Sequence, residues 1–259
     1  AKDPSRVVGM HFFNPVPKMP LVEVIPAAGT DPEVAATPLE LAKRLGKFAV
    51  VVKDSPGFLV NRVLTPYLIE AALMVEEGIP MDGIDRAMRR FGMPMGPVEL
   101  IQHVGTGVAQ HAGQVMLQAF SGRLVGSKLM ETVSADKPFY LGKGRDKRPN
   151  PEIQGFSGKP PQALSEAEIQ ERLVLAMVNE AAWALGEGVV GSARELDLAM
   201  IFGTGFAPFR GGLLRHADTI GIRGCADGVN RLQGRLGSRF TPAPLLLEMA
   251  ASGRAFYPV

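Results

Sequence analysis

The feature that most constrains the fold of this 259-residue chain is a pattern that occurs twice. Residues 62–78 contain Glu-Ala-Ala and end in glycine, and residues 172–188 repeat this pattern at an offset of 172 − 62 = 110. A second match relates residues 84–88 to residues 196–200, at an offset of 112. Apolar residues of the first copy recur at helical spacing. The sequence therefore predicts a duplicated helical unit, since a repeat this long is not a solenoid period.

The first 54 residues have a different pattern. Residues 7–13, 21–25 and 48–52 predict three strands, and the first is apolar on both faces, which indicates burial from both sides. Asp31 and Pro32 predict the start of a helix that runs to about residue 45. Strands buried on both sides that alternate with a helix indicate an α/β sheet. Because three strands and one helix cannot cover such a sheet, we expect residues 1–54 to be the C-terminal remnant of an α/β domain.

The remaining sequence predicts two helical domains and a connection. Ser55 and Pro56 predict a helix N-terminus, which opens a first helical domain over residues 55–133. The helices expected in this domain span 56–78, 82–91 with Asp82 as cap, 97–104 and 108–120. Residues 134–165 are rich in Pro, Gly, Lys and Arg and predict a linker or long surface connection. Residues 166–259 form the second, degenerate copy.

Composition excludes several function classes. The net charge is 28 − 26 = +2, which gives no electrostatic argument for a nucleic-acid or membrane-surface partner. The single Cys225 cannot form an internal disulfide or a cysteine metal cluster, which fits a reducing compartment. The longest stretch without a charged residue, 100–122, contains glutamines, histidines and glycines that hydrocarbon would not accept. No secretory leader is visible, and we expect a cytoplasmic protein without a membrane span or a metal site.

Glu23 is the most unusual residue of the first segment, because it stands mid-strand between two valines. A carboxylate buried there needs a partner, and His11 on the neighbouring strand is available. Two interpretations remain open. His11 is either a core histidine while Glu23 points past a sheet edge, or the two form a His–Glu dyad. In the dyad, the carboxylate would orient the imidazole and raise its basicity for proton transfer.

Other candidate residues carry weaker patterns. Asn61 lies on the second turn of the helix predicted from Pro56, either on a solvated edge or as an amide that binds or polarises a carbonyl. His103 and His111 lack the His-Glu-x-x-His spacing of a zinc site. No Gly-x-Gly-x-x-Gly motif occurs between a predicted strand and a helix. Residues 203–205 look superficially close to one, but Phe-Ala-Pro follows them, and proline breaks the required helix opening.

Several motifs together resemble L-3-hydroxyacyl-CoA dehydrogenases in order and spacing. They are Gly-Met-His-Phe-Phe-Asn-Pro-Val-Pro at 9–17, Leu-Val-Glu-Val-Ile at 21–25, Asp-Ser-Pro-Gly-Phe-Leu-Val-Asn-Arg at 54–62, Tyr-Leu-Ile-Glu-Ala at 67–71 and Met-Pro-Met-Gly-Pro at 93–97. Residues 205–212 and the second copy resemble the α subunit of multifunctional fatty-acid β-oxidation enzymes. The implied fold is mainly α, with tandem 3-hydroxyacyl-CoA dehydrogenase-type helical domains after a remnant of a Rossmann-like α/β domain.

The resemblance also implies site roles. The imidazole of His11 would exchange the C3 hydroxyl proton of an L-3-hydroxyacyl-CoA while hydride passes to or from NAD. Glu23 would hold the imidazole, and the Asn61 amide would contact the substrate near the reacting carbonyl. The glycine-rich turn for NAD phosphates is absent, so the cofactor-binding residues are unknown and we expect the chain alone to be inactive. Gln102-His103 and Pro138 depart from the family pattern. The first is expected to alter either packing or the residues that surround the site, and the second only the linker.

A non-catalytic helical interaction module is the alternative function. Single-copy relatives pair through their helical domains, as the resemblance implies. Two copies in one chain could reproduce that pair internally and leave a monomer, although a homo-oligomer stays open. The expected small-molecule partner is an acyl-CoA substrate.

Overall fold

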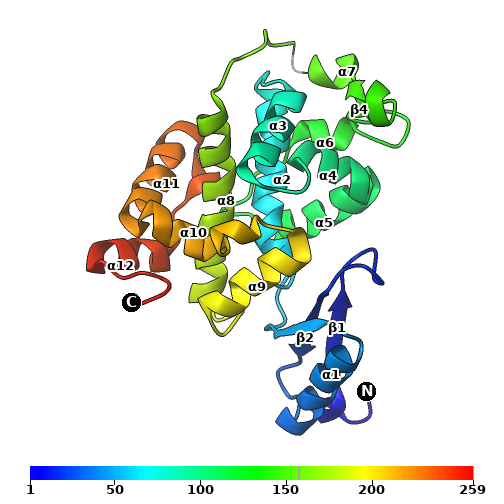
Figure 1. The fold of residues 1–259 in the computed structure, drawn as a ribbon, viewed down its shortest axis with the longest axis vertical. Helices are drawn as coiled ribbons and strands as arrows, with labels where there is room; N and C mark the ends of the chain where they lie inside the picture. Colours follow the sequence, from blue (N-terminus) through cyan, green and yellow to red (C-terminus); the bar gives the residue numbers. More distant parts are fainter. Residues whose placement is uncertain (157, 259) are drawn as a thin grey trace. The chain divides into compact units, whose positions relative to one another are not determined.

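A computed structural model describes residues 1–156 and 158–258 (Figure 1). Ser157 of the predicted linker and Val259 of the second predicted domain lie outside the described residues. The chain forms two compact units, residues 1–63, 180–226 and 243–259, and residues 64–179 and 227–242. The helices are α1 (Pro32–Arg44), α2 (Val60–Glu76), α3 (Met81–Phe91), α4 (Pro97–Val104), α5 (Thr106–Ala119), α6 (Lys128–Thr132), α7 (Pro151–Gln154), α8 (Glu166–Gly186), α9 (Ala193–Thr204), α10 (Leu213–Ile220), α11 (Ile222–Leu236) and α12 (Pro244–Ser252). In the described residues, no helix is both long and apolar enough to cross a membrane.

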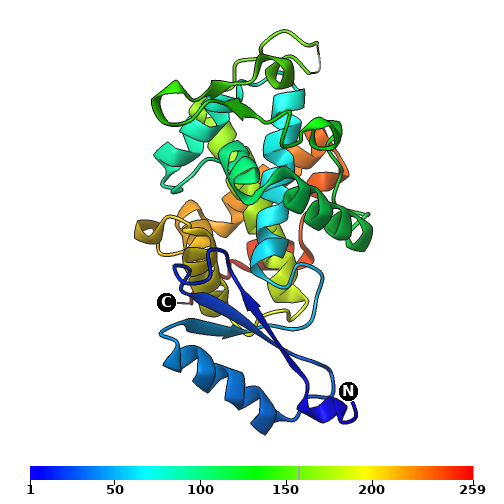
Figure 2. The ribbon, with the colours of Figure 1, turned by 90° about the vertical axis from the view of Figure 1, so that its right-hand side faces the viewer.

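The first unit contains a sheet in the order β1 (Val8–Phe12), β2 (Leu21–Pro26) and β3 (Phe48–Val51). β1 pairs antiparallel with β2, and β2 pairs parallel with β3. Helix α1 packs against all three strands and lies along one face of the sheet (Figure 2). The three predicted strands and the helix after Asp31 are confirmed. The predicted burial of the first strand on both faces is wrong, because every residue of β1 is partly or fully exposed. β2, in contrast, is buried at its first five positions.

The predicted helix start at Ser55 and Pro56 is also wrong. Residues 56–59 form a turn, and α2 begins at Val60. The backbone φ angles of Gly57 (73°) and Phe58 (48°) are positive, which a right-handed helix does not allow. Asp82 likewise does not cap the next helix, because α3 begins one residue earlier and has Pro80 at its N-cap position.

The two compact units do not follow the sequence repeat. α2 and α8 start the two copies, and each helix belongs partly to one unit and partly to the other. A helix is one continuous hydrogen-bonded element, so packing can divide it between units where a sequence pattern cannot show a boundary. The domain boundaries inferred from the sequence therefore stay predictions.

The predicted linker is folded over much of its length, in the second unit. β4 (Tyr140–Leu141) pairs antiparallel with β5 (Arg148–Pro149), and the side chains of Phe139 and Ile153 are fully buried. Gln102 binds both the backbone N–H (2.7 Å) and the carbonyl (3.2 Å) of Tyr140. These apolar residues give part of the segment its own packing contacts, and the linker over residues 134–165 stays a prediction.

A buried carboxylate joins two helices in the first copy. Asp85 of α3 accepts hydrogen bonds from the backbone N–H groups of Val98 (2.8 Å) and Glu99 (3.1 Å), at the start of α4. The hydroxyl of Tyr140 donates a third, at 2.6 Å. Gly96 allows this close approach, since a Cβ atom there would lie 2.2 Å from an Asp85 oxygen. Asp85 therefore caps α4 from outside the helix.

The second copy repeats this arrangement in the first unit. Asp197 of α9 accepts from the backbone N–H groups of Leu214 (2.7 Å) and Arg215 (3.0 Å) and from the hydroxyl of Tyr257 (2.8 Å). A Cβ atom on Gly212 would lie 2.3 Å from Asp197. The predicted internal repeat thus has the same capping geometry in both copies.

Ion pairs also repeat. In the first unit, Arg62 of the first copy binds Glu180 (2.7 Å) and Glu187 (2.8 Å) of the second copy. Adding 110 to the number of Arg62 gives Arg172, the equivalent residue of the second copy.

In the second unit, Arg172 binds Glu70 and Glu77 of the first copy. These two glutamates are the equivalents of Glu180 and Glu187, since 70 + 110 = 180 and 77 + 110 = 187. Arg239 adds a further cation to this cluster, 2.8 Å from Glu70 and 3.2 Å from Glu77. Each copy thus supplies an arginine to the glutamates of the other.

Candidate functional site

The pairing of β1 with β2 places His11 directly opposite Glu23. Directly opposed residues of antiparallel strands project from the same face, with Cβ atoms about 4.5–5.5 Å apart. The strand register therefore brings together the two side chains that the sequence singled out, from residues 12 positions apart (23 − 11).

The Glu23 carboxylate lies in the core. The residue is 0% exposed, so the interpretation that it points past a sheet edge is wrong. Its Oε1 accepts hydrogen bonds from the backbone N–H groups of Leu59 (3.0 Å) and Val60 (2.9 Å), at the start of α2. Its Oε2 is buried without a hydrogen-bond partner among the described residues. Burial raises the Glu23 pKa to about 7, against the opposite effect of the two backbone hydrogen bonds.

His11 is half-buried and is held by aromatic contacts. Its ring makes an edge contact with Phe13, at 4.8 Å between centroids and 81° between planes. The ring of Phe58 lies 5.4 Å away at 51°. Burial lowers the His11 pKa below its ordinary value, so the neutral imidazole dominates at neutral pH. The structure places His11 opposite Glu23 but shows no hydrogen bond between them within the described chain.

Asn61 is the second residue of α2 and is half-buried. It directly follows Val60, whose backbone N–H binds Glu23, so the strand carboxylate and the helix amide belong to one local arrangement. Sequence reasoning placed Asn61 on a second turn. The later start of α2 puts it in the first turn instead, because Glu23 caps the helix at Leu59 and Val60.

Sequence reasoning missed Phe58. Its φ of 48° lies in the left-handed region, which is unusual for a bulky residue and costs on the order of 1–2 kcal/mol. The preceding Pro-Gly pair was the available signal, because that dipeptide marks a turn. The turn at Phe58 brings its ring against His11 and aims the next two backbone N–H groups at Glu23.

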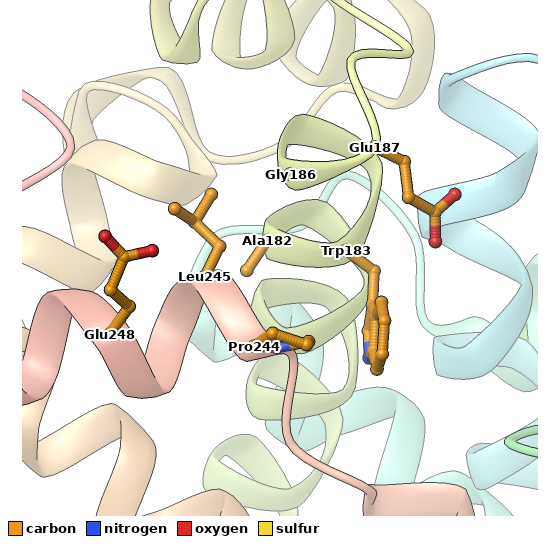
Figure 3. A pocket seen from close by; sticks show the side chains of 7 residues that line it. All are labelled: Ala182, Trp183, Gly186, Glu187, Pro244, Leu245 and Glu248. Atoms are coloured by element: carbon orange, nitrogen blue, oxygen red, sulfur yellow. The ribbon is translucent and has the colours of Figure 1, made fainter.

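A pocket of about 250 Å³ lies elsewhere in the first unit, between α8 and α12. Figure 3 shows Trp183 on α8 and Glu187 just after its last residue, with Pro244, Leu245 and Glu248 on α12. None of the residues predicted to carry chemistry lines it. In the ranges 1–156 and 158–258, no group of three or more His, Cys, Asp or Glu residues is arranged to hold a metal ion.

The first 55 residues do not fit the phosphates of a dinucleotide. A dinucleotide pyrophosphate needs a glycine-rich turn that ends at a helix N-terminus. The helix of this segment, α1, starts instead with Asp31, whose carboxylate accepts from the backbone N–H of Glu33 at 2.9 Å. A carboxylate at that N-terminus opposes an anionic ligand, so α1 does not provide a phosphate site.

The architecture defines a class: a two-copy helical protein preceded by a three-stranded sheet that places His11 opposite a buried Glu23. Residues 57–145 and 169–256 match the family described as 3-hydroxyacyl-CoA dehydrogenase, C-terminal domain. Residues 1–55 match the 3-hydroxyacyl-CoA dehydrogenase, NAD binding domain. This chain belongs to the 3-hydroxyacyl-CoA dehydrogenase family. The resemblance and the mainly helical fold class with tandem dehydrogenase-type domains are thereby confirmed.

Curated relatives include the fatty acid oxidation complex subunit alpha of Vibrio cholerae serotype O1, 39% identical over 100% of this chain and 38% of the relative. The same subunit of Shewanella amazonensis is 40% identical over 99% of this chain and 38% of the relative. The chain thus spans about two fifths of the length of these relatives.

Two solved structures share the fold across most of the chain. The 3-hydroxybutyryl-CoA dehydrogenase of Escherichia coli K12 has a TM-score of 0.78 and 26% identity, covering 96% of this chain and 71% of that one. The dehydrogenase part of multifunctional enzyme 1 from C. elegans has a TM-score of 0.68 and 25% identity, covering 96% and 60%.

Proposed function

We propose that this chain carries the proton-transfer residues of an NAD-dependent L-3-hydroxyacyl-CoA dehydrogenase of fatty-acid β-oxidation, which interconverts 3-hydroxyacyl-CoA and 3-ketoacyl-CoA. The observation that carries the proposal is the buried Glu23 carboxylate opposite His11, with one oxygen unpaired. Burying a carboxylate without satisfying both oxygens costs free energy, and such costs concentrate at functional sites.

His11 is the general base in the oxidation direction. Its lowered pKa keeps the imidazole neutral at neutral pH, ready to accept the proton from the C3 hydroxyl oxygen. The imidazolium that forms is then stabilised by the negative charge of Glu23 across the strand pair. NAD supplies the hydride acceptor in this family. In the reverse direction, the imidazolium returns the proton to the same oxygen.

Asn61 has the second role in this proposal. Its amide lies in the first turn of α2, next to the residues that fix Glu23. An amide N–H donated to the substrate carbonyl would stabilise the negative charge that develops on that oxygen.

Substitution of the histidine tests the proposal. His11→Gln is expected to lower acetoacetyl-CoA-dependent NADH oxidation by about 100-fold or more in the intact natural polypeptide. His111→Gln is the matched control, because His111 is exposed on α5 and should leave the rate unchanged. An undiminished rate in His11→Gln would falsify the assignment. The 259-residue chain by itself is expected to show no His11-dependent rate, since α1, the helix of its first 55 residues, begins with a carboxylate where NAD phosphates would bind.

A second function, a helical interaction module, is favoured by the ion pairs between the copies. Arg62 binds glutamates of the second copy and Arg172 binds glutamates of the first, as the two halves of a symmetric dimer interface would. We propose that the two copies form an internal pseudo-dimer and that the chain is a monomer. Sedimentation equilibrium should give the mass of one chain, and a dimer mass would contradict the idea.

The partners and location follow from the same proposal. The substrate is an acyl-CoA, and the dehydrogenase belongs to a multifunctional, cytoplasmic enzyme. Relatives named as subunits of a fatty acid oxidation complex support this placement. Fractionation of cells that express the intact natural polypeptide should recover it with cytoplasmic enzymes, and recovery with membranes would argue against it.

A further inference from the structure

The second helical copy packs directly against the sheet that carries Glu23, within the first unit. α9 contacts β2 and β3 (Figure 2). The ring of Phe202 on α9 stacks on Phe48 of β3, with centroids 4.1 Å apart and planes at 6°. The segment before α9 is tied to the sheet as well, because the backbone N–H of Lys53 donates to the carbonyl of Val189 at 2.8 Å.

The closest approach is made by Gly203. A Cβ atom on this residue would lie 2.9 Å from Leu21 Cδ2 and 3.0 Å from Val60 Cγ1, tighter than real Cβ contacts allow. Leu21 and Glu23 are two residues apart on β2 and project from the same face. Val60 donates its backbone N–H to Glu23. The missing side chain of Gly203 thus lets α9 press on two residues that flank the carboxylate.

We propose that α9 is a positioning element of the His11–Glu23 site, acting through Gly203. The inference rests on the proposed dehydrogenase function. It assigns the second copy an indirect role in the reaction, through packing against residues beside Glu23. Leu21 is 0% exposed and Val60 is 1% exposed, so the contact seals the flanks of Glu23 from water. α9 thereby maintains the burial that controls how the carboxylate ionises.

The residues paired with Glu23 or hydrogen-bonded to it lie on β1, on β3 and at the start of α2. His11 on β1 is the titratable residue in register with it, and β3 presents Val50. The first turn of α2 presents Leu59 and Val60. Arg62, further along α2, is engaged by Glu180 and Glu187. A change in the Glu23 midpoint on altering α9 therefore reports packing rather than a new charge.

The test is a titration of Glu23 by carbon-13 NMR of labelled glutamate, in this chain. Gly203→Ala should push Leu21 and Val60 aside, admit water and lower the Glu23 midpoint from about 7 by one unit or more. Gly224→Ala is the matched control in the same copy and unit, because a Cβ there meets only an ordinary contact at 3.8 Å. An unchanged or higher Glu23 midpoint in folded Gly203→Ala overturns the proposal.

Two further variants keep the test decisive if Gly203→Ala fails to fold. Phe202→Leu removes the stacking on Phe48, which is 53% exposed, and should lower the Glu23 midpoint by a smaller amount. Gly203→Ala combined with Val60→Ala restores space, and its midpoint should return toward that of Val60→Ala alone. If neither variant moves the midpoint as stated, α9 does not position Glu23.

Kinetics of the intact natural polypeptide separate this inference from the proposed function. Gly203→Ala should shift the pH profile of kcat to lower pH, with KM nearly constant. A rate that is independent of His11 defeats the proposed function, while the NMR result for Glu23 still stands. A rate that depends on His11 but ignores Gly203, with an unmoved Glu23, defeats only the role of α9.

Discussion

Asp85 in the first copy and Asp197 in the second each fix the N-terminus of the next helix with two backbone N–H groups and a tyrosine hydroxyl. At the position equivalent to Asn61, however, the second copy has Glu171 (61 + 110), which is paired with Arg231 on the surface. The second copy keeps the polar contacts that its own packing needs and lacks the amide proposed for chemistry. A buried cap is needed wherever the helix pair forms, whereas the amide is needed only beside the sheet.

The largest effect that tests this comparison concerns the two ion-pair clusters. Arg62→Met removes the cation that binds the buried carboxylate of Glu180, and we expect the free energy of unfolding to fall by about 3–5 kcal/mol. Arg172→Met removes the cation bound to Glu70 and Glu77 and should also lower the free energy of unfolding, while Arg239 still lies 2.8 Å from Glu70. Urea unfolding measures both. No loss in either variant would show that these ion pairs do not stabilise the fold.

The next effect is a pH dependence of the free energy of unfolding that arises at Glu23 on β2. Because the Glu23 pKa is raised from 4.5 to about 7, the folded chain holds a proton there that the unfolded chain releases. The free energy of unfolding should therefore fall, by about 3 kcal/mol, as pH rises from about 4.5 to 7. Glu23→Gln should remove that fall, in denaturation curves recorded across this range.

The control for this prediction lies in the second copy. Burial also raises the pKa of Asp197, so the free energy of unfolding should fall there too as pH rises. Asp197→Asn should remove that part of the fall, which starts at a lower pH than the part due to Glu23. Asp85, with a pKa raised to about 6, adds a slope of the same sign in every variant that retains it. An identical pH profile for wild type and Glu23→Gln would mean that Glu23 titrates normally.

A smaller effect compares the two capping carboxylates directly. Asp85→Asn and Asp197→Asn each exchange an acceptor oxygen for a donor and leave buried N–H or O–H groups unsatisfied. We expect each to lower the free energy of unfolding by about 1–3 kcal/mol, with similar values because the donors are the same in kind. Calorimetry of the two variants measures the difference. A loss in only one copy would break the equivalence.

The smallest effect concerns Phe58, which precedes α2 and whose ring contacts His11 of β1. Phe58→Leu should expose the imidazole and raise the His11 pKa toward its ordinary value, because burial is what lowers it. The chain has four histidines, so NMR titration of their ring resonances can follow each one. Phe209→Leu, at a residue that is 75% exposed, should leave the His11 pKa unchanged. A larger shift in the control than in Phe58→Leu would remove Phe58 from the site.

Much of the fold was predictable because it depends on local patterns. Pro97 and Val104 bound α4 as predicted, and Asp31 begins α1, since capping residues and proline act on their own turn. The start of α2 was not predictable in this way. The Ser-Pro pair before it has the pattern of a cap, but the positive φ at Phe58 and a carboxylate from a distant strand place the start at Val60.

The sequence alone determined that the chain is a helical duplication behind a partial sheet, and that His11, Glu23 and Asn61 are the residues to consider, because repeats, strand alternation and a carboxylate among valines are visible in one dimension. Only the tertiary structure decided which groups bind the Glu23 carboxylate and which helix covers its flanks. Those contacts join Glu23 to Val60, and Leu21 to Gly203, across 37 and 182 positions (60 − 23 and 203 − 21). Burial and desolvation arise from such distant contacts, and they control the ionisation of Glu23 more than its neighbours in sequence do.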